Sequence, residues 1–118
     1  MVTFICYPKC TTCKKAQQWL EDNGIEYTLR NIKEDNPTQD ELRGWYSKSG
    51  QELKKFFNTS GLLYKSMELK SKLPSMTEEE MLELLSTDGM LVKRPLLITE
   101  DNVLVGFKEP QWAECFGK

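Results

Sequence analysis

Two cysteines separated by two residues, Cys10 and Cys13, stand where a short apolar run from Val2 to Cys6 gives way to an amphipathic pattern. This change predicts a strand followed by a helix that begins near Cys10. The first N–H groups of a helix have no partner within the helix, and together with the helix dipole they favour a thiolate over a thiol. Neighbouring lysines add positive charge to the same region: Lys9, Lys14 and Lys15.

A thiolate attacks disulfides, oxyanions and other electrophiles, and a second thiol one helical turn away can release the adduct by forming an intramolecular disulfide. The pair therefore predicts a redox or thiol-transfer site. We expect Cys10, nearer the helix tip, to be the exposed nucleophile. Cys13, one turn into the helix, is then the partly buried resolving thiol.

The same cysteines have two alternative interpretations as metal ligands. Zinc needs four ligands, and because the sequence contains no histidine only Cys6 and Cys115 could complete the set. The spacing of Cys6, Cys10 and Cys13 also matches the iron–sulfur ligands of radical enzymes that use S-adenosylmethionine, but the chain is too short for the barrel of those enzymes. We therefore favour redox chemistry with no bound metal, and expect Cys6 and Cys115 to be buried side chains.

The composition is that of an ordinary globular chain of 118 residues, 39% hydrophobic and 29% charged, with a net charge of −2. This length suits one domain, residues 1–118. No acidic or basic block suggests direct binding to nucleic acid or membrane. No apolar run approaches the roughly 18 residues of a membrane span, and the N-terminus lacks a signal-peptide pattern. We expect a cytoplasmic monomer.

The first thirty residues predict a strand–helix–strand unit. The strand at Val2–Cys6 is followed by a helix from about Thr11 to Asn23, which Gly24 ends by supplying a left-handed residue. Alternating apolar and polar residues then predict a strand over Ile25–Arg30. Short connections of this kind favour a parallel pair with a right-handed crossover.

The middle of the chain predicts helices alone, over about fifty residues (37–89). Thr38 with Glu41, and Thr77 with Glu80, match the capping box that begins a helix, and the second helix is expected to end at Asp88-Gly89. The remainder predicts a hairpin of Leu96–Thr99 and Val103–Val105, then a last helix that begins at Pro110. The order βαβ, helices, ββα predicts an α/β thioredoxin/glutaredoxin-like fold with a helical insertion.

Arg94-Pro95 is the second informative pair. In a thioredoxin-like fold, the residue before the strand that faces the two cysteines is commonly a cis-proline, and Pro95 occupies that place. Arg94 would then point toward Cys10, where a guanidinium can stabilise a thiolate or bind an oxyanion through two hydrogen bonds. The alternative is a surface arginine before a strand, and the sequence leaves both open.

Three segments together resemble the arsenate reductase-like (ArsC/Spx) family, which includes glutaredoxin-coupled arsenate reductases and the transcription regulator Spx. The resemblance runs over essentially the whole chain and implies the same fold. It is carried by Tyr7-Pro8-Lys9-Cys10-Thr11-Thr12-Cys13-Lys14-Lys15-Ala16, by Leu53-Lys54-Lys55-Phe56-Phe57-Asn58-Thr59-Ser60-Gly61 and by Asp88-Gly89-Met90-Leu91-Val92-Lys93-Arg94-Pro95.

The resemblance implies a role for individual residues. Cys10 matches the cysteine that attacks arsenate, and Arg94 matches an arginine of the oxyanion site. Two further arginines of that site fall near Lys54 and on Lys108, where the charge is kept but the planar guanidinium is lost. With these lysines we count Thr11 and Thr12 as candidate oxyanion- or substrate-binding residues. No cofactor is implied beyond an external thiol reductant: glutaredoxin, thioredoxin or a low-molecular-weight thiol.

A non-enzymatic function is the alternative. Many reductases of this group lack a second cysteine at the position of Cys13, whereas Spx has one and uses the pair as a redox switch. Spx contacts the C-terminal domain of the RNA polymerase α subunit near a glycine, and the resemblance implies Gly50 as its counterpart here. The sequence thus leaves a thiol-disulfide oxidoreductase and a redox-sensing regulator as two hypotheses.

Overall fold

A four-stranded mixed sheet is the centre of the computed structural model, which describes residues 2–118. The strand order is β2-β1-β3-β4, with β1 parallel to β2 and antiparallel to β3, and with β3 antiparallel to β4. The parallel pair and the C-terminal hairpin agree with the sequence patterns. The strands are β1 (Thr3–Cys6), β2 (Thr28–Asn31), β3 (Leu96–Ile98) and β4 (Val103–Val105).

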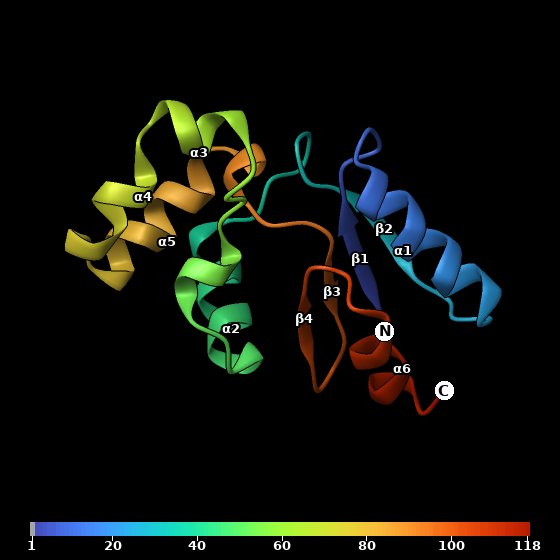
Figure 1. Ribbon diagram of the computed structural model, residues 1–118. Helices are drawn as coiled ribbons and strands as arrows, with labels where there is room; N and C mark the ends of the chain where they lie inside the picture. Colours follow the sequence, from blue (N-terminus) through green and yellow to red (C-terminus); the bar gives the residue numbers. More distant parts are fainter. Residues whose placement is uncertain (1) are drawn as a thin grey trace.

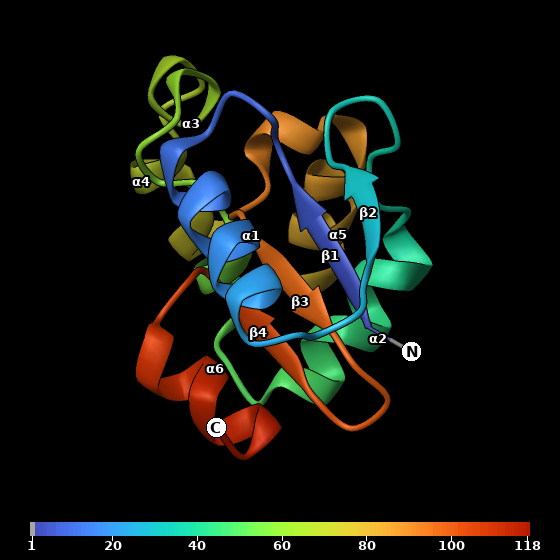
Figure 2. The same cartoon turned by 90° about the vertical axis from the view of Figure 1, so that its right-hand side faces the viewer.

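Two helices, α1 (Thr11–Asp22) and α6 (Glu109–Phe116), cover one face of this sheet (Figures 1 and 2). Helix α1 follows β1 and returns the chain to β2, and its end is followed by Gly24 in the left-handed conformation, with φ of +66°. Helix α6 begins one residue before Pro110, so the expected start is nearly exact. The β1-α1-β2 and β3-β4-α6 units confirm the thioredoxin-like fold.

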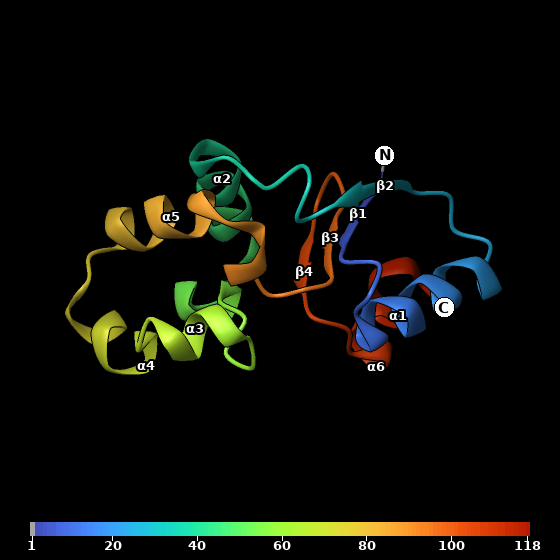
Figure 3. The same ribbon diagram turned by 90° about the horizontal axis from the view of Figure 1, so that it is seen from above.

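The helical insertion lies on the other side of the sheet from α1 and α6 (Figure 3). Both predicted capping boxes are present, because Thr38 and Thr77 each accept from the backbone N–H of the glutamate three residues on. None of the helices in residues 2–118 is long and apolar enough to cross a membrane. The insertion contains α2 (Gln39–Ser49), α3 (Leu62–Ser66), α4 (Leu69–Lys72) and α5 (Glu78–Thr87), with 3-10 turns at Leu53–Phe56, Leu73–Ser75 and Gly89–Leu91.

The sheet separates two apolar cores because successive side chains of a strand point to opposite faces. On β1, Phe4 and Cys6 pack with α1 and α6, whereas Ile5 packs with the insertion. The core under α1 and α6 contains Phe4, Cys6, Cys13, Ala16, Trp19, Leu20, Leu97, Leu104 and Trp112. The insertion therefore packs on one face of the sheet, and Cys13 lies in the core on the opposite face.

The second strand is shorter and lies later in the chain than the alternation predicts. The prediction placed it at Ile25–Arg30, whereas β2 begins at Thr28, whose N–H donates to the Val2 carbonyl at 2.8 Å. Ile25 and Tyr27 are half-buried against the core under α1. Their alternation with polar residues therefore reflects the burial of these two side chains, which precede the first paired residue of β2.

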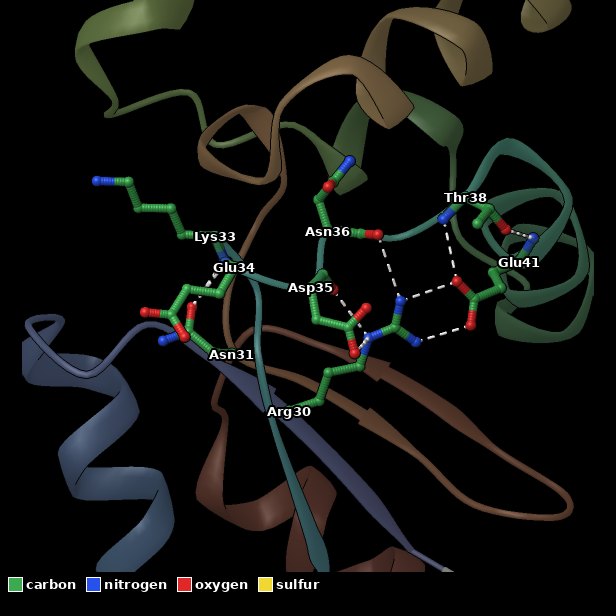
Figure 4. A network of polar contacts seen from close by, with 8 residues as sticks. All are labelled: Arg30, Asn31, Lys33, Glu34, Asp35, Asn36, Thr38 and Glu41. Atoms are coloured by element: carbon green, nitrogen blue, oxygen red, sulfur yellow. Dashed lines mark hydrogen bonds and ion pairs between the residues drawn. The ribbon is translucent and has the colours of Figure 1, made fainter.

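Arg30 joins the sheet to the insertion (Figure 4). Arg30 lies in β2, and its guanidinium forms two hydrogen bonds with the Glu41 carboxylate in the first turn of α2, at 2.7 and 2.9 Å. Its Nε also donates to the Asp35 carbonyl at 2.9 Å. The Arg30 guanidinium, with help from the N–H of Thr38, lowers the pKa of Glu41 to about 2. This pair therefore stays ionised throughout the neutral range.

The two segments that connect the sheet to the helical insertion lie in close contact. The outgoing chain passes through Ile32 and Asn36, and the returning chain passes through Ser86 and Gly89. The Asn36 side chain donates to the Ser86 carbonyl at 2.7 Å, and a Cβ on Gly89 would lie 1.7 Å from the Ile32 carbonyl oxygen. Gly89 was expected only to end a helix. The structure adds a second reason for a glycine at this position, because a side chain would collide with the backbone at Ile32.

The close approach at Gly89 predicts a large loss of stability in Gly89→Ala, at least about 2 kcal/mol, because the two backbones must separate. Gly44→Ala is the matched control: Gly44 lies inside α2 with no atom within 4 Å of its ideal Cβ. That control should gain about 0.5–1 kcal/mol through helix propensity. Urea unfolding followed by circular dichroism measures both. Equal stabilities for the two variants would show that the crossing tolerates a side chain.

Candidate active site

Cys10 and Arg94 line one hollow, of about 650 Å³, between the start of α1, the insertion and the segment that leads into β3. This volume lies in the range of small-molecule sites. The juxtaposition is the one expected from Arg94-Pro95, and the peptide bond between these residues is cis. We call this space the thiol hollow; its lining residues are Cys10, Thr12, Asn58, Ser60, Gly61, Leu62, Leu63, Met90, Lys93 and Arg94.

Cys10 is the N-cap residue of α1. Its backbone is extended, with φ of −86° and ψ of 122°, and its side chain makes no capping hydrogen bond. An N-cap side chain is the one placed to accept from the N–H groups of the second and third helical residues, here Thr12 and Cys13. A thiolate at Cys10 can therefore take the place of the capping oxygen found in other helices, and is half-exposed for attack.

Cys13 lies one turn further on, in contact with Cys6, and both side chains are buried, with 1% and 4% exposed. A side-chain hydrogen bond to Cys6 and burial raise the pKa of Cys13 well above that of a free thiol, and the same bond lowers the pKa of Cys6. Cys13 is thus held as a thiol at rest. Of these three cysteines, Cys10 is half-exposed, whereas Cys13 and Cys6 are both buried.

Tyr7 connects the parts of the site, although no role was predicted for it beyond its place in a resembling segment. Its N–H donates to Cys13 Sγ at 3.3 Å, and its carbonyl accepts from the Cys10 N–H at 2.9 Å. Its ring lies under the Arg94 guanidinium, 5.2 Å from ring centroid to Cζ. One residue therefore positions both thiols and the arginine.

Arg94 has hydrogen-bonding capacity that the protein does not use. Its Nε and Nη1 atoms are buried, and neither has a partner among the residues that the structure describes. Buried donors are rarely left unpaired, and guanidinium N–H groups form strong, charge-assisted hydrogen bonds with a carboxylate or an oxyanion. Because Arg94 lines the thiol hollow, these donors lie close to where a substrate of Cys10 would bind.

The other predicted residues are not all brought together. Thr12 lines the thiol hollow, whereas, within residues 2–118, its lining includes none of Thr11, Lys54 and Lys108. Lys54 lines a different hollow and pairs with Glu52 at 3.4 Å, and Lys108 is exposed at the N-cap of α6. Cys115 is half-buried against the core under α1, and burial raises its pKa.

Asn58 of the insertion and Lys93 after it line the thiol hollow, although neither was expected in the site. The N–H of Asn58 donates to the Leu91 carbonyl at 2.8 Å, and the N–H of Lys93 donates to the Phe56 carbonyl at 2.7 Å. This short antiparallel pairing brings Asn58 and Lys93 to the thiol hollow. The run from Asn58 to Gly61 is typical of a turn. Only its place within a resembling segment could therefore have indicated a site.

Leu62 forms an apolar lip on the thiol hollow. It is the first residue of α3 and is 87% exposed, far more than the other leucines around the site. Leu63 and Met90 line the same space and are half-buried. The hollow therefore combines a reactive sulfur, a cation and an apolar rim.

The comparison with known proteins agrees with this arrangement. The model of the ArsC family matches residues 6–115, which include Cys10, Cys13 and Arg94. The chain belongs to the ArsC family. Among ArsC family relatives, the Bacillus subtilis (strain 168) protein YusI is 54% identical over 96% of each chain. The global transcriptional regulator Spx 1 of Bacillus cereus is 31% identical, over 94% of this chain and 83% of that protein.

Solved structures give the same result for the fold. An ArsC family related protein from Bacteroides fragilis has a TM-score of 0.94 at 57% identity, over 96% of this chain and 95% of that chain. A protein described as a possible arsenate reductase from Streptococcus mutans UA159 has a TM-score of 0.86 at 45% identity, over 92% of each chain. At these TM-scores and coverages, both structures share the fold of this chain over nearly its whole length.

The different environments of the thiols predict selective labelling. Iodoacetamide should modify Cys10 at least about tenfold faster than Cys13, because Cys13 is buried and its pKa is raised. Peptide mass spectrometry of the native protein over time measures this order, and denatured protein, in which all four cysteines react, is the control. The fast phase should disappear in Cys10→Ser. Equal rates at Cys10 and Cys13 in the native protein would contradict the assignment.

Proposed function

We propose that this ArsC family protein is a thiol-disulfide oxidoreductase in which Cys10 attacks an oxidised substrate and Cys13 resolves the adduct. Arsenate is the substrate that the site supports best. The observation that carries this proposal is the Arg94 guanidinium, whose buried Nε and Nη1 have no partner in residues 2–118 and which shares the thiol hollow with Cys10. A tetrahedral oxyanion beside Cys10 would accept a charge-assisted hydrogen bond from this guanidinium.

In the first step, the Cys10 thiolate attacks arsenic and forms a sulfur–arsenic bond, and one arsenate oxygen leaves, after protonation, as water. The free N–H groups at the start of α1 stabilise the sulfur before attack, since Cys10 is the N-cap. Arg94 orients the oxyanion and balances its charge. The N–H groups of Thr12 and Cys13, in the first turn of α1, lie at this same end of the helix.

In the second step, Cys13 loses its proton and attacks the Cys10 sulfur. A disulfide forms, the sulfur–arsenic bond breaks, and its electron pair stays on arsenic, which is reduced from As(V) to As(III). The Tyr7 N–H, 3.3 Å from Cys13 Sγ, favours the charged form of this otherwise buried thiol. An external dithiol, or two low-molecular-weight thiols, then reduces the Cys10–Cys13 disulfide and is itself oxidised.

Steady-state arsenate reduction, with thioredoxin, glutaredoxin or a small thiol as reductant, tests this function. Cys10→Ser should abolish turnover. Arg94→Lys keeps the charge but loses the planar pair of donors, and should raise KM for arsenate by about tenfold or more. Cys115→Ser is the matched control, expected to keep wild-type rates. Unchanged turnover in Cys10→Ser would refute the nucleophile, and unchanged KM in Arg94→Lys would refute the oxyanion site.

A redox-sensing regulator is the second candidate, favoured by the similarity to Spx 1 and by the presence of Cys13. In this function the Cys10–Cys13 disulfide changes binding to the C-terminal domain of the RNA polymerase α subunit. Gly50, at the end of α2, is exposed and left-handed, with φ of +68°, and lines a shallow hollow on the insertion with Tyr46 and Glu79. This is the surface on which such a partner would bind.

A pull-down against the purified polymerase α C-terminal domain, with the protein oxidised or reduced, tests the regulator function. Binding should differ between the two redox states and should be lost in Gly50→Arg. Gly24→Arg is the matched control, because Gly24 has a similar φ of +66° and equally open space but follows α1. Absence of binding in both redox states would remove this candidate.

A further inference from the structure

A second hollow, of about 600 Å³, lies within the helical insertion and takes no part in the proposed thiol chemistry. Its lining residues include members of the 3-10 turn at Leu53–Phe56, of α3, of α4 and of α5. Figure 3 shows that α3, α4 and α5 lie together on one side of the sheet. We call this second hollow the lysine hollow, because four of its ten lining residues are lysines. They are Lys54, Lys55, Lys70 and Lys93, with Phe57, Thr59, Tyr64, Leu73, Pro74 and Met81.

Most of the positive charge of the lysine hollow is unpaired among residues 2–118. None of its lining residues is acidic, and only Lys54 has a nearby carboxylate, that of Glu52 at 3.4 Å. Within residues 2–118, the structure gives no ion pair to Lys55, Lys70 or Lys93. Like charges gathered in a concave surface repel one another and attract a counter-charge more strongly than they would on a convex face.

The floor of the lysine hollow is apolar. Phe57 and Leu73 are 1% and 6% exposed, and the Phe57 and Tyr64 rings lie 6.4 Å apart at an angle of 58°. Met81 and Pro74 complete this surface. A small inorganic anion would contact only the lysines, so the combination of amines above an apolar floor fits a molecule that has both an anionic group and an apolar body.

The lysine hollow also adjoins the thiol hollow. Lys93 lines both, and its backbone is fixed by the hydrogen bond from its N–H to the Phe56 carbonyl at 2.7 Å. The two hollows are therefore neighbours that share one lining residue.

We propose that the lysine hollow is a binding site for an organic anion, in which a carboxylate, sulfonate or phosphate contacts the lysines while an aromatic or acyl body rests on the floor around Phe57. The site is independent of the substrate of Cys10, and holds whether the protein is a reductase or a regulator.

Titration of the ¹⁵N-labelled protein followed by NMR tests the site, with 2-naphthalenesulfonate as the probe. This anion should give saturable shifts at the amides of Phe57, Thr59 and Tyr64. Two matched probes separate the contributions: 2-naphthylmethanol keeps the ring without the charge, and sulfate keeps the charge without the ring. Each should bind at least about tenfold more weakly than 2-naphthalenesulfonate. Equal binding of either probe, or shifts centred elsewhere, would overturn the proposal.

Charge reversal identifies the lysines that bind. The double variant Lys55→Glu/Lys70→Glu should weaken 2-naphthalenesulfonate binding by about tenfold or more, because two attractive contacts become repulsive. Lys33→Glu is the control, since Lys33 is exposed on the loop after β2 and lies outside both hollows. The amide spectra of the variants report whether they are folded. Unchanged affinity in a folded double variant, or an equal loss in Lys33→Glu, would refute the site.

Discussion

The contact between Gly89 and the carbonyl of Ile32 is the constraint on which the rest of the structure depends. At this point the chain that leaves the sheet for the insertion meets the chain that comes back from it, and the distance leaves no room for a Cβ. The Arg30–Glu41 pair (Figure 4) and the Asn36–Ser86 hydrogen bond hold the same junction. The returning chain then reaches Arg94 within five residues, so the junction fixes where the guanidinium lies relative to Cys10.

The chemistry at the sulfurs depends on an asymmetry of environment within a single helical turn. Cys10 lies at the N-terminus of α1, beside its unpaired N–H groups, and lines a hollow that Arg94 also lines. Cys13, in contrast, is enclosed by the core. Burial disfavours a charged sulfur, and a hydrogen bond from a backbone N–H favours it. Tyr7 supplies that hydrogen bond to Cys13 and stacks beneath Arg94, so a single residue links the resting state of one thiol to the position of the cation.

Local patterns in the sequence were enough to predict the features that depend on local physics. Thr38 and Thr77 cap their helices as expected, and the strand predicted at Val2–Cys6 is present as β1, Thr3–Cys6. The features that depend on the path of the insertion were not predictable in this way. Lys54 lies in a 3-10 turn beside Glu52, and four residues later Asn58 reaches the thiol hollow through pairing with Leu91, a contact between segments far apart in the sequence.

The exposed lip at Leu62 has a consequence for how proteins of this fold can diverge. The sulfur and its hydrogen bonds belong to β1 and α1, whereas Leu62 belongs to the insertion, which rests on the opposite side of the sheet. Changes in the lip alter the size and polarity of the entrance while α1 keeps its geometry. Reactivity and selectivity are therefore encoded in separate stretches of the chain, and one can be inherited unchanged while the other is replaced.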